Sequence, residues 1–168
     1  MATATTPRSV PKSLADGEGE VRWFLANLVT IKLTGDETGG HFSLIEMVGP
    51  KGDIAPLHVH RSDDETFLVL EGELTLFVGR QIVRGGPGSV FFAPKGIPHT
   101  YRIESETAKW RVISSPSVFA EFVAQASVPA AAATLPPGPP EGDPERLTAI
   151  AAEYGIEILG PPGTLPST

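Results

Sequence analysis

Two of the four histidines in this chain, His58 and His60, are separated by a single residue. Residues two apart in a β-strand project from the same face, so both imidazoles can reach one point in space. Glu65 follows after the polar stretch RSDD and begins an apolar run. Imidazole and carboxylate groups are typical ligands of divalent transition metals. Taken alone, however, the pair is more simply explained as two exposed histidines on a strand.

A third histidine changes this interpretation. His99 enters a strand directly after PKGIP, a turn whose prolines and glycine restrict where the chain emerges. Three imidazoles and one carboxylate would make a nitrogen-rich site for a divalent first-row metal, with positions left for solvent or substrate. Asp63 and Asp64 are rival acids. Because they lie in the polar turn RSDD, we expect them to be solvated neighbours of the site and not ligands.

Short apolar strands must position these side chains. In LVTIKLT, Val29, Ile31 and Leu33 alternate with polar residues, as in a half-buried strand. Further strands are predicted at HFSLIEMV, TFLVL, LTLFV, VFFAP, HTYRI and KWRVIS, separated by turns rich in glycine and proline. Such closely spaced short strands are typical of an antiparallel sandwich or barrel.

The chain after Pro116 has helical periodicity. SVFAEFVAQA places apolar residues at i, i+3, i+4 and i+7, and Asp143 followed by Pro144 predicts the start of a second helix that ends at Gly155. We therefore predict a flexible arm over 1–19, a barrel with its following helix over 20–126, and a Pro/Ala-rich linker, short helix and tail over 127–168.

Composition limits the possible partners. The chain has 168 residues and a formal net charge of −7, without clustered cations, which argues against nucleic acid as a partner. It has no cysteine, so thiolate metal sites and cysteine nucleophiles are excluded. Without an apolar leader or membrane-length run, we expect a cytoplasmic protein that does not bind membranes. Edge strands of such barrels often pair, so we also expect a homodimer.

The spacing of these residues resembles the two sequence motifs of the cupin superfamily. The first motif reads Gly52, DIAPL, His58-Val59-His60, RSDD, Glu65, TFLVLE and Gly72. The second reads Gly88, SVFFA, Pro94-Lys95-Gly96, IP, His99, TYR, and then Ile103 where an asparagine is usual. Together with the flanking strands, the resemblance covers roughly residues 20–126.

This resemblance implies an all-β fold, a double-stranded β-helix (the cupin or jelly-roll barrel) with C-terminal α-helices. It also implies that His58, His60, Glu65 and His99 hold one divalent transition metal per chain, which would be Fe, Mn, Co, Ni or Zn. Alternation along the strands would place apolar side chains in a substrate pocket around the metal: Phe67, Val69, Phe92, Tyr101 and Ile103. For each of these, ordinary core packing is the simpler explanation.

Among cupins, the chain most resembles the small single-domain proteins of the quercetin 2,3-dioxygenase-like group. We therefore expect a metal-dependent dioxygenase that joins O2 to a small aromatic or enolic molecule, with Glu65 as metal ligand or general base. A redox-free metal-dependent cyclase or isomerase of a polyketide-like substrate is an alternative. A third possibility is a barrel that binds small molecules without catalysis.

Overall fold

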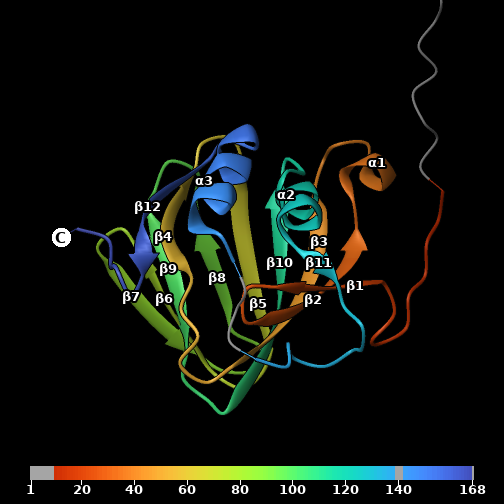
Figure 1. The fold of residues 1–168 in the computed structure, drawn as a ribbon, viewed down its shortest axis with the longest axis horizontal. Helices are drawn as coiled ribbons and strands as arrows, with labels where there is room; N and C mark the ends of the chain where they lie inside the picture. Colours follow the sequence, from red (N-terminus) through yellow and green to blue (C-terminus); the bar gives the residue numbers. More distant parts are fainter. Residues whose placement is uncertain (1–9, 139–141, 168) are drawn as a thin grey trace, which may run out of the picture.

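The computed structural model describes residues 10–138 and 142–167. Its strands form two antiparallel sheets that face each other (Figure 1). In the order of paired neighbours, the larger sheet contains β11 (Val128–Pro129), β1 (Glu20–Phe24), β2 (Asn27–Leu33), β3 (Ser43–Pro50), β10 (Thr107–Ser115), β5 (Asp64–Glu71) and β8 (Val90–Ala93). The smaller sheet contains β12 (Ile156–Pro162), β4 (Pro56–His60), β9 (His99–Ile103), β6 (Leu74–Val78) and β7 (Gln81–Gly85).

The middle of the chain crosses repeatedly between the two sheets. β3, β5, β8 and β10 lie in the larger sheet, whereas β4, β6, β7 and β9 lie in the smaller one. These crossings wind the chain into a double-stranded β-helix, with C-terminal helices added to it, which confirms the predicted fold class.

Strand alternation sets which side chains face the interior. In β10, Ala108, Trp110 and Val112 are buried, as the apolar pattern predicts. β2 departs from the half-buried strand that its sequence predicts, because the polar side chain of Lys32 is also buried. Its Nζ donates a hydrogen bond to the carbonyl oxygen of Glu18 at 2.6 Å, which compensates for the lost hydration.

Among the described residues, three helices accompany the sheets: α1 (Gly35–Thr38), α2 (Phe119–Ala126) and α3 (Pro144–Glu153). The predicted start of the last helix is confirmed, since the Asp143 carboxylate accepts hydrogen bonds from the backbone N–H groups of Glu145 and Arg146 at 2.9 and 3.3 Å. In the described ranges 10–138 and 142–167, no helix combines the length and apolarity needed to cross a membrane.

The C-terminal segment packs against the barrel. α2 contacts α3, where the rings of Phe122 and Tyr154 lie 6.2 Å apart. β12 then pairs with β4, so that Ile156 is opposite His60 and Ile158 is opposite His58 (Figure 1). The C-terminal segment therefore neighbours the strand that carries the His-x-His pair.

The predicted division into segments 1–19, 20–126 and 127–168 stays a prediction. Residues 1–9 of the expected flexible arm and residues 139–141 of the expected linker lie outside the described residues. Within the described part of the last segment, β12 forms one edge of the smaller sheet.

Candidate metal centre

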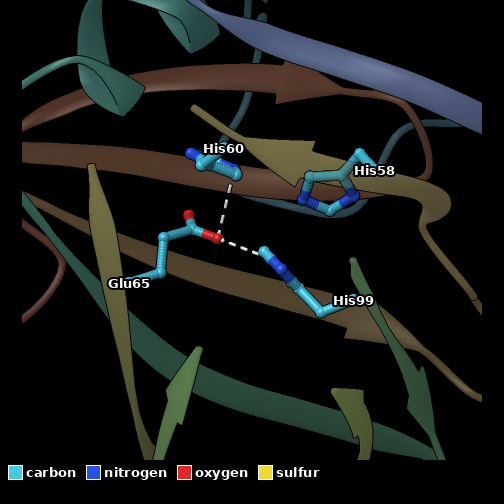
Figure 2. A group of neighbouring side chains, drawn as sticks. All are labelled: His58, His60, Glu65 and His99. Atoms are coloured by element: carbon cyan, nitrogen blue, oxygen red, sulfur yellow. Dashed lines mark hydrogen bonds and ion pairs between the residues drawn. The ribbon is translucent and has the colours of Figure 1, made fainter. Parts of the chain in front are cut away.

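The strands bring the four predicted ligands together. His58 and His60 project from β4, and His99, the first residue of β9, is the direct pairing partner of His58. Glu65 reaches the same point from β5 in the opposite sheet. Figure 2 shows the four side chains converging between the sheets. Residues far apart in the sequence thus meet because both motifs lie on strands of one barrel.

The distances within this cluster are those of a compact site. One nitrogen or oxygen atom from each of the four residues lies within 4.8 Å of all the others. Glu65 Oε2 is 3.3 Å from His60 Nε2 and 2.9 Å from His99 Nε2 (Figure 2). His60, Glu65 and His99 are each at most 2% exposed. Water therefore has little access to these groups.

Each of the three histidines is oriented through its Nδ1 atom. His58 Nδ1 lies 2.8 Å from the carbonyl oxygen of Pro56, and His99 Nδ1 lies 3.1 Å from that of Ile97. His60 Nδ1 lies 2.9 Å from Asp63 Oδ2. An acceptor at Nδ1 favours the tautomer with the proton on that atom, which leaves the Nε2 lone pair free. Three Nε2 lone pairs and one carboxylate can then serve as ligands.

The structure contradicts the prediction that Asp63 is a solvated neighbour. Its side chain is fully buried, at 0% exposure, and accepts the His60 hydrogen bond. The polar stretch RSDD folds this carboxylate back onto the imidazole three residues earlier. Asp64 is the first residue of β5 and is only partly buried, and its Oδ1 accepts the backbone N–H of Lys95 at 2.8 Å.

Asp64 also links the two motifs. Its bond to Lys95 fixes one end of the PKGIP turn, and Gly96 N–H donates to the carbonyl oxygen of His60 at 2.7 Å. Gly96 has a φ of 79°, in the left-handed region that glycine adopts without a steric penalty. The turn that precedes His99 is thereby held against the end of β4.

The buried polar atoms of the cluster fit a divalent metal. Among the described residues, His60 Nε2 and Glu65 Oε1 are buried without a hydrogen-bond partner. A neutral imidazole has a single N–H, so His99 can satisfy both the Ile97 carbonyl and Glu65 only as an imidazolium. A cation among the Nε2 atoms and the carboxylate would satisfy all of these acceptors with neutral histidines.

The protonation states of Glu65 and His58 also suit metal binding. Burial alone would raise the pKa of Glu65, but the positive charge of His60 and the hydrogen bond and charge of His99 lower it to about 2. Burial, together with the like charges of His99 and His60, lowers the pKa of His58 to about 3. Burial opposes charge on His60, but Glu65 and Asp63 together raise its pKa. At neutral pH the acid is ionised and His58 is neutral, as metal ligands must be.

A small chamber of about 50 Å³ adjoins the cluster. Its polar side chains are His58, Glu65 and Tyr101, and the remaining lining residues are apolar: Phe24, Leu25, Met47, Ala55, Pro56, Phe67, Val112, Phe119, Phe122, Leu147, Ile156 and Ile158. Of the predicted pocket residues, Phe67 and Tyr101 therefore line the chamber. Val69 and Ile103 are buried in the core but are not part of this lining.

Phe92 does not belong to the chamber, so its predicted place there is wrong. The ring is 57% exposed on the outer surface of the barrel. The register of β5 and β8 explains this, because Phe67 pairs with the buried Phe91 whereas Thr66 pairs with Phe92. Neighbouring residues on a strand face opposite sides, and Phe91 takes the inward position.

The C-terminal segment supplies much of the chamber wall. Phe119 and Phe122 reach it from α2, Leu147 from α3, and Ile156 from β12. The Phe119 ring lies 5.7 Å from that of His60. The i, i+3 spacing of the two phenylalanines predicted an apolar face on this helix. It did not predict that this face lines the chamber beside the metal cluster.

Comparison with known proteins agrees with the resemblance of the two sequence motifs to the cupins. Residues 44–115 match the family model of the cupin domain. Quercetin 2,3-dioxygenase from Bacillus subtilis is 34% identical over 110 residues, which are 65% of this chain and 33% of that protein. The chain thus spans about a third of the length of this curated relative.

Solved cupin structures share the fold. An RmlC-like cupin from Shewanella frigidimarina has a TM-score of 0.54 and 18% identity, covering 64% of this chain and 93% of that one. A predicted oxalate decarboxylase from Thermotoga maritima has a TM-score of 0.51 and 18% identity, covering 54% of this chain and 80% of that one. At such identities the likeness shows the fold alone.

Proposed function

The chain belongs to the cupin superfamily, and we propose that it is a metal-dependent dioxygenase of a small aromatic or enolic molecule. In this proposal His58, His60, Glu65 and His99 hold one divalent transition metal. The observation that carries it is the convergence of three Nε2 atoms and one carboxylate beside an apolar chamber. The 34% identity to quercetin 2,3-dioxygenase supports the choice of reaction class.

Glu65 has the position of a general base. Its Oε2 faces His60 and His99, whereas its Oε1 is buried without a hydrogen-bond partner in the described part of the chain. Oε1 is therefore the atom that would accept the hydroxyl proton of an enolic substrate, leaving an electron-rich enolate. A bound divalent metal would supply Lewis acidity that stabilises the enolate oxygen and, if redox-active, would assist electron transfer to O2.

The chamber would determine which substrates are accepted. Its lining is apolar apart from His58, Glu65 and Tyr101, so it favours a flat or hydrophobic molecule over a sugar phosphate or a dicarboxylate. The apolar wall would also exclude water from the carboxylate and strengthen electrostatic interactions there. Both effects support a reaction through an enolate, which bulk water would quickly reprotonate.

Oxygen consumption tests this function. Protein loaded separately with Fe, Mn, Co or Ni would be mixed with flavonols in an oxygen-electrode cell. We expect uptake with at least one metal, and Glu65→Gln should lower it about 10²- to 10⁴-fold, because an amide cannot accept the proton. Metal analysis of the same variant should show ion retained by the three imidazoles. No uptake with any metal would contradict the proposal.

A Zn-loaded preparation and the Glu65→Gln variant distinguish the alternatives. Turnover by the Zn-loaded protein under anaerobic conditions would assign a redox-free cyclase or isomerase. Ligand binding that is equal in wild type and Glu65→Gln, without turnover in either, would assign a binding protein.

A further inference from the structure

The chamber beside Glu65 is much smaller than the space outside it. Its volume is about 50 Å³, whereas sites for small organic ligands usually have several hundred Å³. An outer groove of about 660 Å³ lies next to it and includes Trp23, Asp53 and Arg146 in its wall. A ring-containing substrate is larger than the chamber, so to bind beside Glu65 it must also occupy an adjoining space, and the groove is such a space.

Three residues form this boundary, because they line both the chamber and the groove: Leu25, Pro56 and Leu147. Leu25 lies in the tight turn between β1 and β2, where Phe24 pairs with Asn27, and Leu147 lies on α3. Both leucines pack against the core but are only partly buried. Pro56 is fixed on β4, but the two leucine side chains belong to separate elements and can open the boundary by rotamer changes without breaking a strand.

The backbone of Leu25 is unusual. Its φ is 54°, and among the described residues no other non-glycine residue has a positive φ. Two-residue hairpin turns favour glycine or asparagine at such positions, because a larger side chain is strained there. Glycine would relieve the strain but would remove the side chain from the boundary. Leucine at this position therefore places an apolar side chain in the boundary at a cost in backbone energy.

We propose that Leu25 and Leu147 form a movable partition between the chamber and the outer groove, and that they determine the largest substrate that reaches Glu65. When the partition opens, the two spaces form one elongated site. The reacting end of the substrate lies beside Glu65, and its distal ring lies in the groove near Trp23. Asp53 and Arg146 can bind polar groups on that ring. This assignment rests on the proposed function only in placing the reacting end at Glu65.

Two probes of different size test the partition. 3-Hydroxyflavone and maltol share the same hydroxyketone group, but maltol lacks the fused and pendant rings. Their association rates would be measured by stopped-flow spectroscopy with the full chain, both metal-free and Zn-loaded. Leu25→Gly and Leu147→Ala should each raise the rate for 3-hydroxyflavone about tenfold, because opening then limits binding less. The rate for maltol should change less than about twofold.

Leu159→Ala is the matched control, since Leu159 is exposed on β12 and lines neither space. It should leave both rates unchanged. Thermal unfolding of each variant would show that it is folded, and the second leucine provides a test if one variant is not. Equal acceleration of both probes, or unchanged 3-hydroxyflavone binding in both folded variants, would overturn the partition. These rates need no turnover, so failure of the oxygenase assay would leave this result interpretable.

Discussion

Replacing Asp63 by asparagine should weaken metal binding although Asp63 is not one of the four proposed ligands. The Asp63 carboxylate is fully buried and lies 2.9 Å from His60 Nδ1, so it orients the imidazole and increases the electron density at Nε2. An amide at this position keeps the shape but loses the charge. Changes of this kind around ligating histidines typically lower metal affinity about 10- to 100-fold. That corresponds to about 1.4–2.8 kcal/mol of binding free energy.

The assay is competition for Zn²⁺ or Co²⁺ with a chromophoric chelator, at one pH and ionic strength. Asp64→Asn is the matched control, because it removes the same charge from the adjacent residue, and its amide oxygen can still accept the Lys95 N–H. We expect Asp64→Asn to bind within about threefold of wild type. Equal affinities for Asp63→Asn and Asp64→Asn would refute the role of Asp63 in orienting His60.

Two further predictions concern stability. Burial raises the pKa of Asp53, so this residue contributes stability at low pH that is lost as the pH rises through its raised folded-state pKa. The free energy of unfolding of Asp53→Asn, measured with urea relative to wild type, should therefore rise as the pH is increased from about 3 to about 7. A difference between the two proteins that does not change with pH would contradict this. Trp110 is fully buried and its ring lies 5.1 Å from that of Tyr101. Trp110→Ala should lower the free energy of unfolding by about 3–5 kcal/mol, whereas Ile113→Ala, at a partly exposed site on the same strand, should cost less than about 1 kcal/mol.

The four-residue cluster could be predicted because local rules place several of its members and because the spacing of the two motifs resembles that of the cupins. Alternation places His58 and His60 on one face of β4, and the PKGIP turn fixes the start of β9 at His99. The pairing of His58 with His99 is a long-range contact, and only the resemblance to the cupin motifs implied that these residues share one site. Glu65 was also predictable, since it begins the alternating apolar run of β5.

Other features depend on long-range packing. The burial of Asp63 follows from how RSDD folds back on His60, and polar composition alone predicts the opposite. For Phe91 and Phe92, only the register with β5 decides which ring faces inward. The chamber wall formed by Leu147 and Ile156 requires the last segment to return to β4, which nothing local specifies.

The metal content of the purified, untagged protein tests the central claim most directly. The four-residue cluster predicts about one transition-metal ion per chain by mass spectrometry after removal of loosely bound metal. His60→Ala combined with His99→Ala should lose that ion, whereas His41→Ala, which changes an exposed histidine outside the cluster, should retain it. Wild-type protein that neither contains nor takes up such an ion, or a double variant that holds as much as wild type, would contradict the account.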